Sequence, residues 1–234
     1  MAVTGVADNV AQPDASVISL FGMIKLICPL KQGTLHLRDM INQFQLTESS
    51  LKNALFVFAL ESEEAGEFDG CNKLITGIGK VNAAYALTKH LHTQRPDLII
   101  NQGSAGSNVF KRGEVVCCTR FIQRDMDVRG LGFAMYETPL SGIPPVLKYG
   151  LEMDGLQQGI CGTGDSFQME HSSADYNILD MEAYPLALIA MKEKIPFLCL
   201  KYISDGADGS AAEDWTVQVH LTAKAFKQIL FPNR

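Results

Sequence analysis

The sequence predicts an α/β fold, and three features of the 234-residue chain support this prediction. From residue 54 onward, short apolar runs alternate with longer amphipathic segments, the rhythm of parallel strands that helices bury on both faces. Glycine-rich turns and carboxylates follow several of the apolar runs, at the strand ends where open α/β sheets place ligands. With 47% hydrophobic and 20% charged residues, the chain is long enough to bury one sizeable core.

The first part of the alternation predicts two strands and one helix. Ala54–Leu60 (ALFVFAL) predicts a strand because it is a short, continuous apolar run. Lys80–His92 predicts a helix, since its apolar residues recur near helical spacing: Val81, Ala84, Leu87 and Leu91. Asp97–Asn101 (DLIIN) predicts a second buried strand, which runs into a glycine-rich turn predicted over Gln102–Ser107.

The second part predicts the remaining elements. Glu114–Thr119 predicts a strand, and the glycines and prolines of Leu131–Leu156 predict a long loop. Met181–Glu193 predicts a helix that Pro196 separates from a strand over Phe197–Ile203. Val217–Leu230 predicts a closing amphipathic helix.

Composition and charge disfavour several classes of protein. Lys and Arg number 20 against 26 Asp and Glu, a net charge of −6 that argues against a nucleic-acid partner. The sequence contains no apolar run of 18 residues and no basic, apolar leader, so we expect neither a membrane span nor a secretory signal. Its six cysteines form no C-x-x-C pair, which favours reduced thiols in a cytoplasmic protein without a zinc site.

Carboxylates gather at three predicted strand ends or turns: Glu61-Ser62-Glu63-Glu64, Asp180-Met181-Glu182 and Ser204 to Gly209. A carboxylate just beyond an apolar strand is partly desolvated, which raises its pKa and suits it to proton transfer. Asp205 fits this description best, although Ser204, Asp205 or Asp208 could equally cap a turn. Glu63 could equally belong to a solvated helix start. Position alone therefore leaves catalytic and structural roles open.

Seven blocks follow one another along the chain: ALESEE (59–64), TGIGKVNAA (76–84), PDLIINQGSAGS (96–107), RDMDVRGLGF (124–133), GTGDSF (162–167), LDMEA (179–183) and YISDGAD (202–208). In this order they resemble the purine nucleoside phosphorylase and nucleosidase superfamily, most closely its methylthioadenosine/S-adenosylhomocysteine nucleosidase branch. The resemblance makes residues 54–234 a nucleosidase/phosphorylase-like domain and leaves residues 1–53 as an N-terminal extension of unknown role. It implies a three-layer αβα sandwich around a mixed, partly barrel-like sheet.

The resemblance also implies cleavage of the N-glycosidic bond between ribose and a purine, and the aspartate at position 205 suggests adenine. We expect no cofactor and no metal. Asp205 matches the family's acid, which protonates N7 of the leaving base, and Ser204 stands beside it in the same substrate-binding block. Glu182 and Met181 match the pair that holds the ribose. Glu63 matches the glutamate that deprotonates the attacking water. Five further matches line the sugar or the base in the family: Ser104, Ala105 and Gly106 lie on the sugar side, Phe167 stacks on the base, and backbone groups of Gln168 read its edge.

Other properties follow from the resemblance less directly. In the family's homodimers, the block around Leu131, Phe133 and Pro139 reaches the neighbouring pocket, so we expect a homodimer. Ile99–Gln102 lacks the arginine that related phosphorylases carry there to hold phosphate, which favours water as the nucleophile. Arg120, Arg124 and Arg129 follow a different strand and do not decide between the two nucleophiles.

Two alternatives to a nucleosidase stay open. One is a phosphate-dependent purine nucleoside phosphorylase on the same scaffold. The other is a non-catalytic purine-nucleoside-binding module, because only nine residues, Ala65–Lys73, separate the Glu63 block from the next predicted strand. The sequence does not specify the 5' substituent of the substrate, and Asp180 receives no role.

Overall fold

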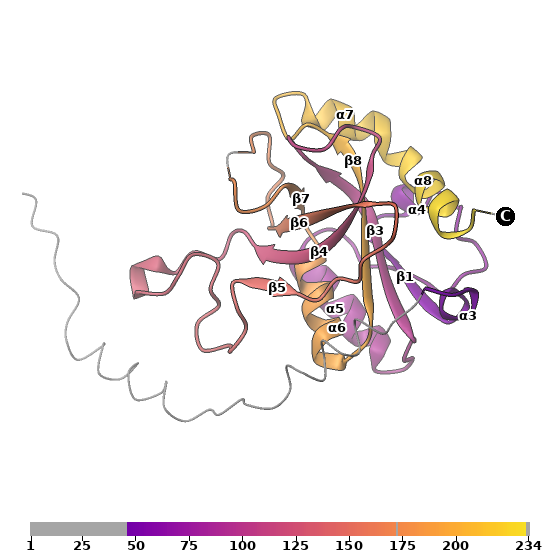
Figure 1. Ribbon diagram of the computed structural model, residues 1–234, viewed down its shortest axis with the longest axis horizontal. Coiled ribbons are helices and arrows are strands. Elements are labelled where there is room, and N and C mark those ends of the chain that lie inside the picture. Colours follow the sequence, from indigo (N-terminus) through magenta and orange to yellow (C-terminus); the bar gives the residue numbers. More distant parts are fainter. Residues whose placement is uncertain (1–45, 172, 233–234) are drawn as a thin grey trace, which may run out of the picture. The chain divides into compact units, whose positions relative to one another are not determined.

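The computed structural model describes residues 46–171 and 173–232, and its elements alternate as predicted (Figure 1). In chain order they are α3 (Glu48–Lys52), β1 (Ala54–Phe58), α4 (Glu61–Glu64), β2 (Lys73–Ile75), α5 (Lys80–Leu91), β3 (Leu98–Gly106), β4 (Val115–Gln123), the 3₁₀ turn η1 (Arg129–Leu131), β5 (Val146–Lys148), β6 (Gln157–Thr163), β7 (Ile178–Asp180), α6 (Ala183–Glu193), β8 (Phe197–Asp205), α7 (Ala211–Gln218), the 3₁₀ turn η2 (Val219–Leu221) and α8 (Thr222–Leu230).

The strands of the described residues form one eight-stranded mixed sheet that partly closes on itself. β3 pairs in parallel with β8, β8 antiparallel with β4, and β4 in parallel with β6. β6 then pairs in parallel with β7, and β7 returns to β3 through Gly106 and Leu179. Five strands therefore make a closed ring, while β1 and β2 continue the sheet from the first half of β3.

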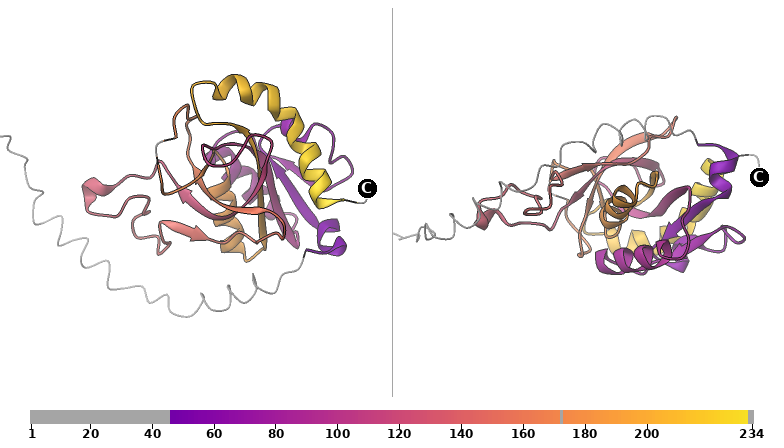
Figure 2. Two further views of the ribbon diagram at one scale, coloured as in Figure 1. Left: turned by 45° about the horizontal axis from the view of Figure 1, so that its top comes forward. Right: turned by 90° about the horizontal axis from the view of Figure 1, so that it is seen from below.

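Helices cover both faces of the sheet, as Figures 1 and 2 show: α5 and α6 on one face, α7 and α8 on the other. β3 shows the division, because Ile99 belongs to the core cluster of α5 and α6 whereas Ile100 belongs to the cluster of α8. Side chains of a strand alternate between its faces, so β3 and β8 contribute to both clusters. The predicted α/β class and the three-layer arrangement with a mixed sheet are confirmed.

Several predicted boundaries of strands, helices and loops are wrong. The predicted turn over Gln102–Ser107 is strand up to Gly106, because β3 pairs residue by residue with β8 through Ala105. The predicted loop 131–156 contains the short strand β5, paired with β4. The helix predicted from Met181 begins at Ala183, and the helix predicted over Val217–Leu230 is interrupted by η2.

The described part of the N-terminal extension packs on the domain. Leu51 of α3 is buried in the cluster of α8, and Asn53 Nδ2 donates to Asp97 Oδ2 at 3.0 Å. The predictions for residues 1–45 lie outside the described residues. Within the described residues, no helix is long and apolar enough to cross a bilayer.

Candidate active site

A cavity of about 360 Å³ opens beside the carboxyl ends of β3, β7 and β8. Nine of the ten predicted site residues line it: Glu63, Ser104, Ala105, Gly106, Phe167, Met181, Glu182, Ser204 and Asp205. The tenth, Gln168, lines an adjoining space of about 40 Å³ together with Phe167 and Asp205. The structure therefore brings together side chains from segments up to 142 residues apart, from Glu63 to Asp205.

Glu63 lies in the short helix α4 and is buried, so it does not belong to a solvated helix start. Its Oε1 accepts hydrogen bonds from Ser104 N at 2.8 Å and Ser104 Oγ at 2.6 Å. Its Oε2 accepts from the backbone N–H groups of Ala59 and Leu60 at 3.2 and 3.3 Å. Four donors thus hold the carboxylate at the cavity wall.

Trp215 of α7 completes this wall, a role that sequence reasoning missed. Its Nε1 donates a hydrogen bond to Ser104 Oγ at 2.8 Å, so the Ser104 hydroxyl accepts from the indole N–H and donates to Glu63 Oε1. The signal available in the sequence is that Trp215 is the single tryptophan of the chain, and it follows the Asp205 block within ten residues.

A buried ion pair that sequence reasoning also missed lies at the cavity, which Asp180 helps to line. Lys201 Nζ is 2.8 Å from Asp180 Oδ2, and both side chains are 1% exposed. Burial alone raises the pKa of Asp180, but the Lys201 ammonium and the hydrogen bond from Thr163 bring this pKa below its ordinary value. Burial lowers the pKa of Lys201, and the Asp180 carboxylate reverses this and holds it well above its ordinary value. Both groups are therefore charged.

Asp180 also organises the turn that carries Met181 and Glu182. Its Oδ2 accepts from Ala183 N at 2.7 Å and Glu182 N at 3.2 Å, at the start of α6. Its Oδ1 accepts from Thr163 Oγ1 at 2.5 Å. The residue to which the sequence assigned no role thus caps the helix that follows the two predicted ribose contacts.

Glu182 is buried at the cavity, and its Oε1 accepts from Gly79 N at 2.8 Å. Burial raises the pKa of its carboxyl to about 8, and the negative charge of Asp180 adds to this effect. Its second oxygen has no protein donor among the described residues. A buried carboxyl with this free capacity can bind sugar hydroxyls.

Asp205 ends β8 and is buried, and burial raises the pKa of its carboxyl. Its Oδ1 accepts from Ala207 N at 2.9 Å, and Ser204 Oγ lies 2.8 Å from its Oδ2. Asp205 therefore does cap the following turn, and it lines the cavity as well. A Cβ at Gly106 would come within 2.6 Å of Asp205 Oδ1, so this position requires glycine.

The segment after β6 forms the outer wall of the cavity. Phe167 stands there with half of its surface exposed, and Gln168 Nε2 donates to Ser166 Oγ at 3.0 Å. Arg124 holds this segment: its guanidinium donates to the Gly164 carbonyl and to Ser166 Oγ, each at 3.1 Å, and to the Ser166 carbonyl. Arg124 thus supports the Phe167 segment, which its place in the sequence did not reveal.

Comparison with known proteins bears on the fold and on the reaction. A model of the phosphorylase superfamily matches residues 65–230. The chain belongs to this superfamily. The 5'-methylthioadenosine/S-adenosylhomocysteine nucleosidase of Bacillus subtilis is 30% identical over 194 residues, which cover 70% of this chain and 83% of the relative. The nucleosidase of the same name from Exiguobacterium is 33% identical over 162 residues, 59% of this chain and 68% of the relative.

Solved structures with low sequence identity share the fold. A mutant of the Helicobacter pylori MTAN, with 5'-methylthioadenosine in its active site, has a TM-score of 0.67 and 19% identity over 76% of this chain and 98% of its own. The futalosine hydrolase of Helicobacter pylori has a TM-score of 0.66 and 17% identity over 78% of this chain and 99% of its own. The family resemblance predicted from the seven blocks is confirmed.

The charged side chains that line the 360 Å³ cavity are all carboxylates: Glu63, Asp180, Glu182 and Asp205. Among the described residues that line the 360 Å³ cavity, none is arginine or lysine. Asn101, in the strand where related phosphorylases are expected to carry arginine, is buried and donates to the Val57 carbonyl at 3.3 Å. In the described chain, no group of three or more His, Cys, Asp or Glu side chains is placed to hold a metal ion.

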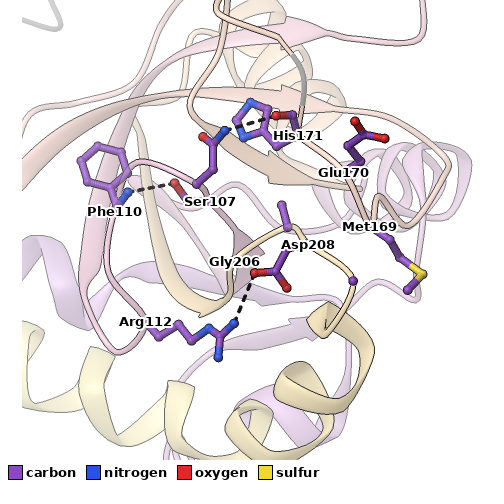
Figure 3. Close-up of a pocket in the computed structure, with 11 residues that line it drawn as sticks. Ser107, Phe110, Arg112, Met169, Glu170, His171, Gly206 and Asp208 are labelled. Carbon is purple, nitrogen blue, oxygen red and sulfur yellow. Dashed lines mark hydrogen bonds and ion pairs between the residues drawn. The ribbon is translucent and has the colours of Figure 1, made fainter.

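A second cavity of about 610 Å³ is lined by residues that follow those of the first cavity in the chain (Figure 3). Ser107 comes directly after Gly106, and Gly206 comes directly after Asp205. Several polar groups of this second cavity contact one another or a neighbouring residue. Arg112 pairs with Asp208 at 3.6 Å and with Asp214 at 2.7 Å, and Ser107 Oγ accepts from Phe110 N at 3.1 Å. None of the predicted site residues lines this cavity.

Proposed function

We propose that this chain hydrolyses the N-glycosidic bond of adenine nucleosides of the methylthioadenosine or S-adenosylhomocysteine type, releasing adenine and the free sugar. One observation carries the proposal: three carboxyl groups from α4, from the residue before α6 and from β8 converge on one cavity. Each of these carboxyl groups has a different environment. This fits a reaction that needs an acid, a base and a group that stabilises a cation. The two bacterial relatives bear the name of this activity.

Asp205 is the proposed general acid. Burial favours its protonated form, which can donate to N7 of the purine as the bond between the base and the sugar breaks. The electron pair of that bond moves into the base, and the proton neutralises the charge that would develop there. Aspartate rather than asparagine at this position fits a 6-amino purine. Phe167 stacks on the base, and the Gln168 backbone reads its edge.

Glu182 is the proposed ribose contact. Its carboxyl binds the sugar hydroxyls and Met181 packs against the ring, and these contacts favour an oxocarbenium-like transition state. Gly106 and Ala105 line the sugar, where a glycine and an alanine leave room for it.

Glu63 is the proposed base for the attacking water. Its carboxylate accepts one proton of the water while the water oxygen bonds to the anomeric carbon of the sugar cation. Ser104, with Trp215 behind it, fixes the orientation of the carboxylate. Water rather than phosphate is the proposed nucleophile, because a phosphate dianion normally needs a cationic partner. The cavity lining of the described residues offers none.

We also propose that the chain works as a homodimer in the cytoplasm. Large apolar side chains are exposed on α5 and on the segment around η1: Val81, Tyr85, Leu131 and Leu140. Figure 1 shows the η1 segment extending away from the sheet, where a second copy can reach it. The buried cysteines 117, 118, 161 and 199 are unbridged, which fits a reducing compartment. Light scattering on the full chain tests the dimer: a mass near 51 kDa supports it and 25.6 kDa refutes it.

The experiment that tests the reaction is incubation of the purified chain with methylthioadenosine, S-adenosylhomocysteine, adenosine and inosine, with and without phosphate. Chromatography then follows the free base and the sugar product. Adenine release without phosphate supports the nucleosidase, and the substrates rank the 5' preference. A strict need for phosphate, with a sugar 1-phosphate product, refutes hydrolysis in favour of the phosphorylase. Stabilisation by nucleoside without product identifies a binding module.

A further inference from the structure

Helix α5 begins in a way that its own residues do not stabilise. Its N-cap is Gly79, with φ of 93° and no side chain to accept a hydrogen bond from the first turn. Its first helical residue is Lys80, a cation at the positive end of the helix dipole. Two unfavourable features at one helix start call for a compensating group elsewhere in the fold.

Asp165, from the segment after β6, supplies that group. Its Oδ1 accepts from Lys80 N at 2.7 Å, which caps α5 from outside the helix. Lys80 Nζ lies 2.5 Å from Asp125 Oδ1 and 3.7 Å from Asp165 Oδ2. Asp165 N in turn donates to Asp125 Oδ2 at 3.0 Å. Three residues from the ends of β4 and β6 and the start of α5 therefore form a closed set of contacts.

This set of contacts joins the two halves of the proposed substrate site. On one side, Gly79 N donates to Glu182 Oε1 at 2.8 Å. On the other side, Asp165 is two residues before Phe167 in the segment that forms the outer wall. Gly79 and Asp165 are in close contact, since a Cβ at Gly79 would lie 3.1 Å from Asp165 Oδ1.

We propose that Asp165, held by Asp125 and Lys80, is a positioning residue that places the Gly79 amide on Glu182 and so fixes the ribose-binding carboxylate relative to the base-stacking Phe167. This inference rests on the proposed function, because it assigns the ribose to Glu182 and the base to Phe167. Asp165 itself does not line the cavity that holds those residues.

Glu182 is the carboxylate most sensitive to such positioning. Glu63 has four donors, whereas the Gly79 amide is the donor to the Glu182 carboxylate among the described residues. The groups around Glu182 that also bear on its charge are Asp180 and Glu63, which repel it, and Lys201, which attracts it. Displacement of Gly79 would leave the carboxylate without its orienting contact.

The test compares Asp165→Ala with Asp165→Asn in the full chain, using hydrolysis of methylthioadenosine. We expect Asp165→Ala to lower kcat/KM about 10- to 100-fold, the range that a misplaced binding group produces. Asp165→Asn keeps an oxygen that can accept from Lys80 N, so we expect it to recover the activity to within about threefold. Asp69→Ala is the matched control, because Asp69 is an exposed carboxylate that pairs with Lys73 away from the cavity.

A double-mutant cycle separates positioning from a general structural effect. In a Glu182→Ala background, Asp165→Ala has nothing left to position and should lower kcat/KM by less than about threefold. Equal losses in both backgrounds, or no loss in the parent, overturn the inference. If Asp165→Ala does not fold, the same cycle is run with Asp125→Asn. We expect this variant to lower kcat/KM by less than Asp165→Ala does, and to leave kcat/KM unchanged in the Glu182→Ala background. No adenine release by the unmodified chain overturns the proposed function and the inference with it, whereas parent activity unaffected by Asp165→Ala overturns the inference alone.

Discussion

Replacing Lys201 with methionine removes the cation of the buried ion pair and leaves Asp180 as an isolated carboxylate with a side chain 1% exposed. Removal of one partner from a buried pair costs about 3 to 5 kcal/mol, because the remaining charge has lost both water and its counter-ion. For a domain of this size, each kcal/mol lowers Tm by about 2 to 4 °C. We therefore expect Lys201→Met to lower Tm by about 6 to 20 °C near neutral pH.

The pH dependence of this loss tests the reason for it. In the parent the folded-state pKa of Asp180 lies below 3.8, its unfolded value, so the pair stabilises above that pH and the stabilisation is lost as the pH falls through the folded pKa. Without Lys201, burial raises the folded pKa, so stability is greatest below the unfolded pKa and falls as the pH rises. The difference between parent and variant should therefore grow from about pH 4 to about pH 7.

The assay is thermal unfolding followed by circular dichroism at both pH values. Lys227→Met is the matched control, since Lys227 pairs with Glu67 at 3.1 Å while its side chain stays 42% exposed, and solvent-accessible pairs contribute about 0 to 1 kcal/mol. Adding Asp180→Asn to Lys201→Met should restore part of the lost stability, because the amide carries no charge. A loss in Lys201→Met that is equal at both pH values would refute the ionic explanation in favour of packing alone.

Three further predictions concern the carboxyl groups of the cavity. Asp205→Asn should lower kcat for adenine release by about 100- to 10,000-fold with little change in Tm, and near-parental kcat would exclude Asp205 as the acid. Glu63→Gln should still bind methylthioadenosine in calorimetry but should not hydrolyse it, and hydrolysis at the parental rate would remove its proposed role. The pKa of Glu182 is raised from 4.5 to about 8, so its burial costs stability increasingly as the pH rises through that window. Glu182→Gln should therefore gain Tm relative to the parent from pH 5 to pH 8, and a constant difference would contradict the raised pKa.

The sequence predicted the carboxylates of the cavity, but it did not predict the residues that support them. Asp205 and Glu63 are recognisable because each is an acidic residue at the end of an apolar run, inside a block that resembles a known family. Their chemical type and their place along the chain both point to the cavity. The sequence alone left each with a structural alternative, and for Asp205 the structure shows that the structural contact and the cavity position coexist.

Lys201 and Asp180 could not be paired from the sequence, because β7 and β8 are not neighbours in the sheet and their contact depends on the closed ring of strands. The available signal was local: Lys201 is the one charged residue in the apolar run FLCLKYI, and a lysine buried in a strand requires a counter-ion.

The glycine-rich segment after Asn101 failed as a turn prediction for a similar reason. Glycines at 103 and 106 are typical of turns when the segment is considered alone. In the fold, β8 supplies a hydrogen-bonding partner along this whole stretch, and the small residues let the strand pass close to Glu63 and Asp205. Tertiary pairing thus outweighed local propensity at the point where the cavity needed space.

The closed ring of β3, β8, β4, β6 and β7 has a consequence for how such a site can diversify. Asp205 and the turn that carries Glu182 leave strands that are paired on both sides, so the spacing between acid and ribose contact is set by the sheet and resists change. Phe167 and Gln168 belong to the segment between β6 and β7, which lies outside the strands and is held by side-chain contacts of Arg124 and Asp165. The acid and the ribose contact are therefore placed by backbone pairing in the sheet, whereas the base contacts are placed by side chains that single substitutions can alter.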